Sequence, residues 1–184
     1  MRSSVLLAVV PLLIATPSGA QQGPSALSQS DKEFLDFAAT VNQSEVQGGL
    51  AAEKKADAPA VRAFARLIVL DHMELESQLA AIAAENGVQL PSGPSEQAKQ
   101  EMANLQNMSG SKFDTMYMQD MVRGHEQAVQ RFKSEKGQAQ ARPVEAVVAT
   151  ALPILEQHLA IAQAVQSGIQ NQASGTIGNA NKRN

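Results

Sequence analysis

Three histidines are the residues of this 184-residue chain that could do chemistry, and each lies in a different helical stretch. His72, His125 and His158 fall on stripes of mostly apolar residues that recur every three or four positions, the pattern of a helix with one buried face. A fourth such stripe carries one carboxylate, Glu45. Neutral imidazoles with a carboxylate suit Zn²⁺, Fe²⁺ or Cu²⁺, and four ligands could close a tetrahedral site. The sequence therefore predicts Glu45, His72, His125 and His158 as metal ligands.

The positions of these residues along their helices place them at one level. The first predicted turn lies near position 58, so that Glu45 and His72 are both about 20 Å from it at about 1.5 Å per residue. The second turn lies near position 140, and His125 and His158 differ in distance from it by about 4.5 Å, within the error of the turn position. We expect all four side chains to meet inside the bundle.

A structural role for the histidines is the alternative. A histidine on an apolar helical face is often a buried residue that is hydrogen-bonded to a neighbour, so His72 could pair with Glu45, and His125 with His158. The Glu-x-x-His pair of di-iron bundles is also absent, because its glutamate positions hold Val69, Val122 and Leu155. This absence argues against ferroxidase chemistry.

The helices that must hold these residues are marked by clear start and stop signals. Ser30 and Glu33 form a capping-box pattern that predicts the first helix start. Pro59 can open the second helix, and Asn86-Gly87 can end it. The third helix is expected from Ser111 to Gly137, and the fourth from Pro143 to Val165.

The connection between the second and third long helices, residues 88–110, is longer than a tight hairpin needs. It contains a weakly amphipathic stretch, Ser95 to Met108, that predicts a short helix. A connection of this length could cross the whole bundle and make the two long helices parallel. We therefore predict an all-α fold: a four-helix bundle, ferritin-like, with a long connection containing a short helix.

The N-terminal residues 1–20 have the pattern of a signal peptide. Arg2 precedes an apolar run from Val5 to Ala15, and small residues stand at Ser18 and Ala20. Cleavage after Ala20 would place the mature protein in the periplasm. No later stretch reaches about 18 apolar residues, so we expect no transmembrane segment in the mature chain.

The remaining sequence divides into three parts. Residues 21–29 are expected to form a flexible N-terminal segment, and residues 30–165 the bundle domain. Residues 166–184 are rich in Gln, Asn, Gly and Ser, so we expect a disordered polar tail.

Composition excludes several functions. The chain has no cysteine, which excludes thiolate metal sites, disulfides and a cysteine nucleophile. Its formal net charge is −3, so it offers no basic field for nucleic acid. Hydrolase and phosphate-binding motifs such as Gly-x-Ser-x-Gly are also absent, and an enzyme is the less supported class.

Four motifs in order resemble the bacterial domain of unknown function 4142 family over about residues 31–165. They are Phe34-x-x-x-Ala38 with Glu45-Val46 and Leu50-Ala51; Val61-Arg-Ala-Phe-Ala65 with Asp71-His72; Phe113-Asp114-x-x-Tyr117 with His125-Glu126; and Leu152-Pro153-x-Leu155-x-x-His158-Leu159. The resemblance implies a ferritin-like helical bundle in an exported protein, and it implies no established activity, substrate or metal.

Two functions follow as alternatives. The first is an exported periplasmic bundle that binds a transition metal through the Glu/His cluster, in a role related to stress. The second is a non-catalytic envelope structural or interaction protein with a buried histidine cluster and no metal.

Overall fold

The structure, a computed structural model, describes residues 27–180, with side chains as far as Gln172. This part of the chain forms five helices and no strand. They are α1 (Gln29–Lys55), α2 (Pro59–Glu85), α3 (Glu96–Gln106), α4 (Gly110–Glu135) and α5 (Arg142–Ala180). The all-α prediction is confirmed, while the ferritin-like classification stays a prediction. The predicted signal peptide lies outside the described residues.

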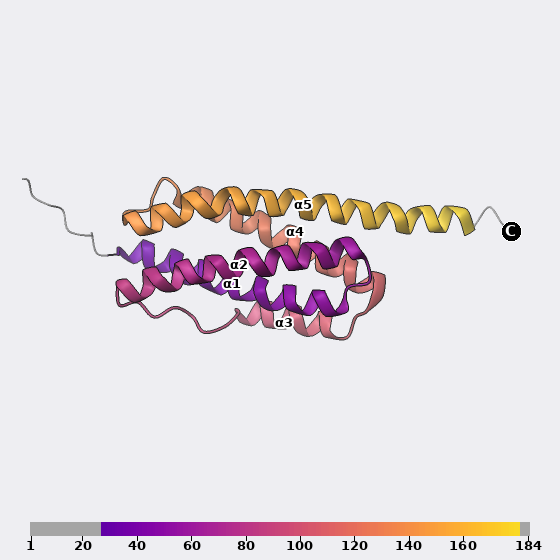
Figure 1. Cartoon of the computed structure of the whole chain (residues 1–184), viewed down its shortest axis with the longest axis horizontal. Coiled ribbons are helices and arrows are strands. Elements are labelled where there is room, and N and C mark those ends of the chain that lie inside the picture. The colour runs from indigo at the N-terminus through magenta and orange to yellow at the C-terminus, as the bar shows by residue number, and fades with distance from the viewer. Residues whose placement is uncertain (1–26, 181–184) are drawn as a thin grey trace, which may run out of the picture.

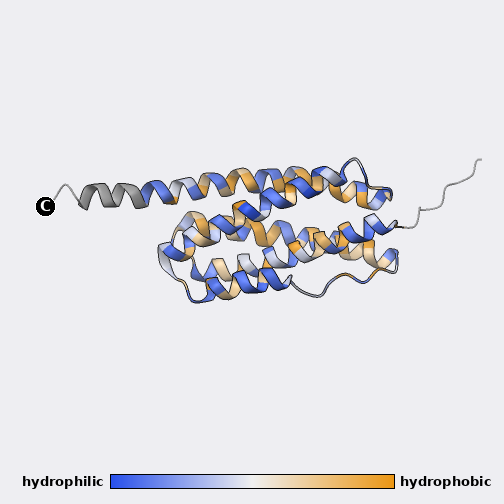
Figure 2. Cartoon of the chain, turned by 180° about the vertical axis from the view of Figure 1, so that it is seen from behind, coloured by the Kyte–Doolittle hydropathy of each residue, from blue (hydrophilic) through white to orange (hydrophobic). Residues whose placement is uncertain are grey.

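The four long helices pack as two antiparallel hairpins. Helix α1 pairs with α2, and α4 pairs with α5 (Figure 1). The two hairpins meet through contacts between α2 and α5 and between α1 and α4. Figure 2 shows apolar positions recurring along the long helices between hydrophilic ones, as a shared core requires.

The connection that follows α2 runs back along the molecule before α4 begins, so α2 and α4 point in the same direction (Figure 1). The predicted short helix is present within it as α3, capped by Ser95. The Gln43 side-chain amide donates to the Pro91 carbonyl over 2.8 Å, and the Lys55 ammonium donates to the Gln106 carbonyl. These bonds fasten both ends of the connection to α1.

Helix α1 begins earlier than predicted. Ser28 is its N-cap, and Ser28 and Asp31 form the capping box in place of Ser30 and Glu33. The Asp31 carboxylate also accepts from the Gln140 amide over 3.1 Å, which ties α1 to the α4–α5 connection. This bond to a distant segment favours the Ser28 cap over the similar local pattern of Ser30 and Glu33. Residues 28 and 29, at the end of the predicted flexible segment, are therefore part of the helix start.

Helix α5 differs from the sequence prediction at two places. The spacing of Val147, Ala151, Ile154 and His158 in the sequence predicts a buried Ile154. Ile154 is 41% exposed, and its neighbour Leu155 is buried. The helix also continues to Ala180, where we expected a disordered tail from residue 166. Ile169 packs against the core four residues after Val165, so the apolar stripe extends into that segment. Elongation of an existing helix is favourable once it is nucleated.

Within the described residues, α5 is also long and apolar enough to cross a membrane by length and composition, over Arg142–Gln172. Its apolar face contributes Val144, Ala151 and Ala162 to the core. A core helix has the same composition, so this feature is weak evidence for a membrane span.

Candidate metal centre

A polar layer divides the core of the protein into two apolar clusters. One cluster lies on the side of Phe34, Leu79 and Phe132, and the other on the side of Ile68 and Tyr117. Along each long helix the polar residue falls between the two clusters. The buried members of this layer are Asn42, Glu45, His72, His125 and His158. Polar groups in the middle of a core are destabilising unless they are partnered, so this layer requires a chemical reason.

The structure brings the three histidines together. Their ring centroids are 5.9 Å apart for His72 and His125, 5.5 Å for His72 and His158, and 5.4 Å for His125 and His158. One nitrogen of each ring lies within 4.8 Å of a nitrogen from each of the others. All three side chains are at least 97% buried. Their proximity agrees with the common level expected from the sequence.

In each ring one nitrogen, called the outer nitrogen below, faces an oxygen atom of a residue outside the histidine cluster. His72 Nδ1 lies 3.0 Å from Asn42 Oδ1, and His125 Nδ1 lies 2.9 Å from the Met121 carbonyl oxygen. His158 Nε2 lies 2.8 Å from Asp71 Oδ2. Since these oxygens are acceptors, the three outer nitrogens are the protonated donors of neutral rings. Such outer contacts fix the tautomer and orientation of metal-ligating histidines.

The opposite nitrogens are the ones available to bind. His72 Nε2, His125 Nε2 and His158 Nδ1 are buried, and within residues 27–172 none has a hydrogen-bond partner. In the tautomers set by the outer contacts, each carries a lone pair. A metal ion bound to the three lone pairs would satisfy all of them at once, so the donor set fits a transition metal with imidazole preference.

The electrostatics of the cluster favour this neutral state. Burial lowers the pKa of His72 well below its ordinary value of 6.5, and His125 and His158 lower it further. Burial also lowers the pKa of His158, although the hydrogen bond to Asp71 acts in the opposite sense. Both rings therefore stay unprotonated, as metal ligation requires.

Glu45 stands apart from this set of nitrogens. Its Oε1 lies 3.9 Å from His125 Nδ1, the nitrogen that already faces the Met121 carbonyl. Burial raises the pKa of Glu45, His125 lowers it, and Asp120 and Glu101 raise it. The structure thus brings together three of the four predicted ligands, and it places Glu45 beside the outer edge of His125.

Two residues of the site were not among the predicted ligands. The spacing of apolar residues in the first helix favours Val41 for its buried face, but Asn42 is 1% exposed and Val41 is not fully buried. Asp71 is turned about 100° around the helix from His72, which predicts a solvated residue or an inter-helix salt bridge, and it forms an inter-helix pair with His158. Its position directly before His72 was the available signal. Glu76 lies four residues after His72 on the same side of the helix, where it could add a carboxylate, but its side chain is exposed.

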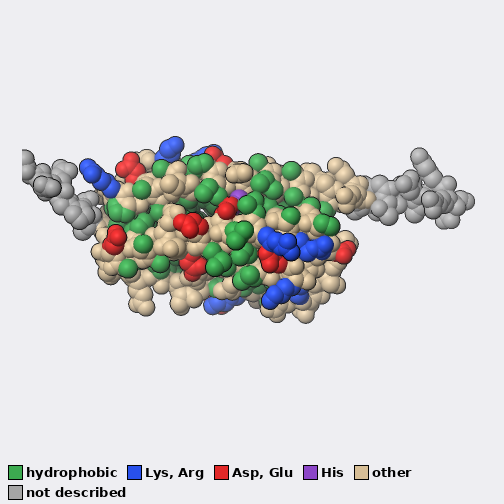
Figure 3. All heavy atoms as spheres, viewed as in Figure 1, with side chains coloured by type: hydrophobic (Ala, Val, Ile, Leu, Met, Phe, Trp, Pro, Cys, Tyr) green, Lys and Arg blue, Asp and Glu red, His purple; other side chains and the backbone are tan. Residues whose placement is uncertain are grey.

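The cluster is close to the surface between α2 and α5. A cavity of about 40 Å³ is lined by Asp71, His72 and His158 together with residues of both helices. Figure 3 shows a small area of histidine surface beside an acidic side chain on this face. This cavity forms an opening toward His72 and His158.

Solved structures of three other proteins have a similar fold. A DUF305 fragment from Deinococcus radiodurans has a TM-score of 0.69 at 18% identity, covering 77% of this chain and 98% of its own. A DUF305 protein from Streptomyces coelicolor, named as secreted, has a TM-score of 0.67 at 15% identity, covering 77% and 92%. At these identities the likeness concerns the fold alone.

The third is CopM, at 14% identity in its Cu(II)-bound form, with a TM-score of 0.65 covering 75% of this chain and 96% of CopM. Its Ag-bound form has a TM-score of 0.55 at 15% identity, covering 79% and 96%. No curated protein sequence matches the chain significantly. The domain of unknown function DUF4142 matches residues 16–165, which is most of the chain. The protein therefore belongs to the DUF4142 family, as its sequence motifs suggested.

Proposed function

We propose that this protein is an exported metal-binding protein that holds one copper ion between His72 Nε2, His125 Nε2 and His158 Nδ1. The observation that carries the proposal is a set of three clustered histidines, each with one buried, unpartnered nitrogen on a ring whose other nitrogen faces an oxygen acceptor. A purely structural histidine cluster would be expected to use its polar atoms on one another or on neighbouring groups.

The donor set favours copper over the other metals expected from the sequence. Three imidazoles without a bound carboxylate differ from the carboxylate-rich sites of di-iron bundles. Among divalent first-row ions, Cu²⁺ binds a given nitrogen site most tightly, and imidazole is a good copper ligand. CopM, which shares the fold, has been solved with Cu(II) and with silver. Zinc is the second candidate, since three histidines and a water also form a common zinc site.

Glu45 has a supporting role in this proposal. Three protein ligands leave a coordination position open, in contrast to the closed four-ligand site expected from the sequence. Glu45 lies within reach of the outer edge of His125, where it adds a second acceptor near Nδ1. This arrangement suits a site that receives and releases an ion.

Export is part of the same proposal and rests on the pattern of residues 1–20. One similar structure is named as secreted, which agrees with it. A mature protein that begins at Gln21 in the periplasmic fraction is the expected result.

Elemental analysis of native protein tests metal identity. The mature chain is purified from the periplasm without a histidine tag and without added metal, and the copper, zinc and iron contents are measured. We expect copper to exceed zinc and iron. A preparation that holds zinc or iron in stoichiometric amount and no copper would contradict the assignment to copper.

A further inference from the structure

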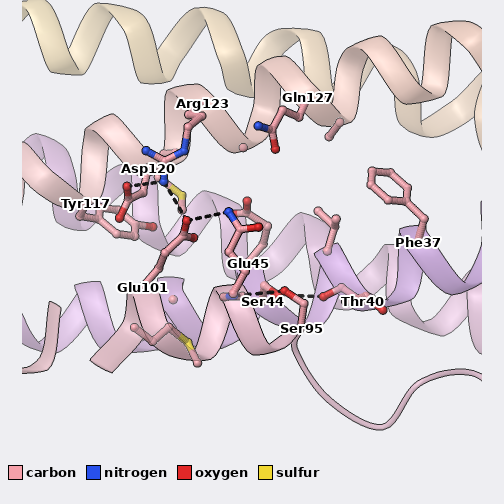
Figure 4. Close-up of a pocket in the computed structure, with 18 of the residues that line it drawn as sticks. Phe37, Thr40, Ser44, Glu45, Ser95, Glu101, Tyr117, Asp120, Arg123 and Gln127 are labelled. Carbon is pink, nitrogen blue, oxygen red and sulfur yellow. Dashed lines mark hydrogen bonds and ion pairs between the residues drawn. The ribbon is translucent and has the colours of Figure 1, made fainter. Parts of the chain in front are cut away.

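A second cavity lies between α1, α3 and α4, whereas the opening toward the histidines lies between α2 and α5. The second cavity encloses about 420 Å³ and is lined by residues of all three helices (Figure 4). This volume is in the range of small-molecule sites. Helix α3 forms one wall, so the long connection has a structural consequence beyond joining two helices.

The charge inside the cavity is unbalanced. Four acidic residues line it, and Arg123 is the one basic side chain among the described residues that do so; the acidic residues are Asp36, Glu45, Glu101 and Asp120. The Arg123 guanidinium lies 2.7 Å from Asp120 and 3.0 Å from Glu101, as Figure 4 shows. One cation is set against four carboxyl groups, so the local field favours a positively charged ligand.

Two buried polar atoms of the lining residues are unpartnered. Glu45 is 6% exposed and Tyr117 is fully buried, and within the described part of the chain Glu45 Oε2 and the Tyr117 hydroxyl have no hydrogen-bond partner. Both residues line the cavity. An unpaired buried carboxyl and an unpaired hydroxyl that line one cavity can both accept from a hydrogen-bond donor bound there.

Part of the lining is apolar. Phe37, Val41, Met102 and Leu105 contribute hydrocarbon or thioether surface. An inorganic cation would require several oxygen ligands around it and would gain nothing from such walls. A ligand with an apolar body and a cationic, hydrogen-bonding head matches both parts of the cavity.

We propose that this cavity binds a small organic cation, an amine or guanidine with an apolar body, whose charged head is received by Glu45 and Tyr117. The apolar body lies against Phe37, Met102 and Leu105. The site uses Glu45 and Tyr117 and none of the three unpartnered histidine nitrogens, so binding here can be measured on metal-free protein.

Calorimetric titration of the metal-free mature protein with benzylammonium tests the proposal, with benzyl alcohol as the neutral ligand of similar shape. We expect saturable binding of one benzylammonium, and at least about tenfold weaker binding of the alcohol, because a hydrogen bond to a charged group is worth more than a factor of ten. Equal affinity for the two ligands, or no binding of benzylammonium, would overturn the proposal.

Two variants locate the site. Glu45→Gln keeps the size of the side chain and should weaken benzylammonium at least about tenfold. Gly48→Leu should abolish binding, since a Cβ at Gly48 meets nothing nearer than Tyr117 Cε2 at 4.0 Å and a longer side chain enters the cavity. Glu126→Gln removes the same charge from an exposed position outside the cavity and should leave the affinity unchanged. Unchanged affinity in both cavity variants, or displacement of benzylammonium by millimolar Mg²⁺, would contradict this assignment.

Discussion

Asp71 of α2 accepts a hydrogen bond from Nε2–H of His158 on α5 over 2.8 Å. This hydrogen bond determines which nitrogen of His158 remains without a proton. The carboxylate keeps Nδ1 of His158 unprotonated and joins two helices at the level of the site. Asn42 and the Met121 carbonyl hold His72 and His125 in the corresponding way. The three rings are therefore arranged by three contacts from outside the cluster.

The first prediction concerns this outer contact. Asp71→Asn should lower the copper affinity about 10- to 100-fold, because the amide no longer fixes the tautomer and basicity of His158. Copper affinity is measured by competition with a chelator of known strength. Glu76→Gln, an exposed carboxylate on the same helix, is the matched control and should behave as wild type. An Asp71→Asn protein with wild-type affinity would show that the contact does not support a metal ligand.

The second prediction compares two adjacent glycines of α1. A Cβ at Gly49 would lie 2.7 Å from Val69 Cγ2 and 3.1 Å from the Ala65 carbonyl, whereas a Cβ at Gly48 would meet only Tyr117 Cε2, at an ordinary contact distance of 4.0 Å. Gly49→Ala should therefore destabilise the protein by about 1 to 3 kcal/mol through overpacking. Gly48→Ala should stabilise it by about 0.5 to 1 kcal/mol through helix propensity. Urea unfolding of the two variants is the measurement, and equal midpoints would mean that α1 and α2 are not in such close contact.

The third prediction concerns pH. The pKa of His72 and of His158 is lowered in the folded state. Below the ordinary value of about 6.5 the unfolded chain therefore binds more protons than the folded chain, and acid favours unfolding. The contribution of the two neutral histidines is complete above that pH and is lost as the pH falls toward their lowered values. Metal-free protein in EDTA should melt at a lower temperature at about pH 5 than at about pH 7.

Glu45 acts in the opposite sense, because burial raises its pKa above 4.5. Its contribution to stability is present at low pH and is lost as the pH rises through the raised value. Melting of Glu45→Gln should therefore fall more steeply with acid than that of wild type, and melting of His72→Gln less steeply. Identical slopes for the three proteins would contradict the burial of both groups in one layer.

The fourth prediction tests the packing register. Leu79 is 1% exposed, and Leu79→Ala should lower the free energy of unfolding by about 2 to 5 kcal/mol. Ile154, which the sequence placed on the same kind of stripe, is 41% exposed. Ile154→Ala should change stability by less than about 0.5 kcal/mol. A larger loss at Ile154 than at Leu79 in urea unfolding would mean that the buried stripes are assigned wrongly.

The sequence predicted the height of the site along the helices better than it predicted which residues form the site. Counting residues from a turn determines height along a helix, and this was sufficient to bring His72, His125 and His158 together. It does not determine which way a side chain points around the helix axis, so Glu45 was expected among the ligands although it lies at the outer edge of His125.

Features that depend on contacts between distant segments could also not be predicted from local sequence patterns. Ser28 and Ser30 have similar capping patterns, and the bond from Gln140 to Asp31 favours the first. Ile154 and Leu155 are both large and apolar, and only the position of α2 and α4 around α5 determines which one is buried. Ile169 extends the stripe of α5 because the second core cluster reaches that far.

Copper titration of the tag-free mature protein and its single-histidine variants is the most direct test of the central claim. The chain contains three histidines, so each His→Gln change removes one of the proposed ligands and leaves no other histidine to replace it. The account predicts one copper per wild-type chain, loss of stoichiometric binding in each variant, and stabilisation of wild type by about 2.7 kcal/mol when free copper is 100 times the dissociation constant. An unchanged melting temperature of wild type with copper, or full copper binding by any one of the three folded variants, would contradict it.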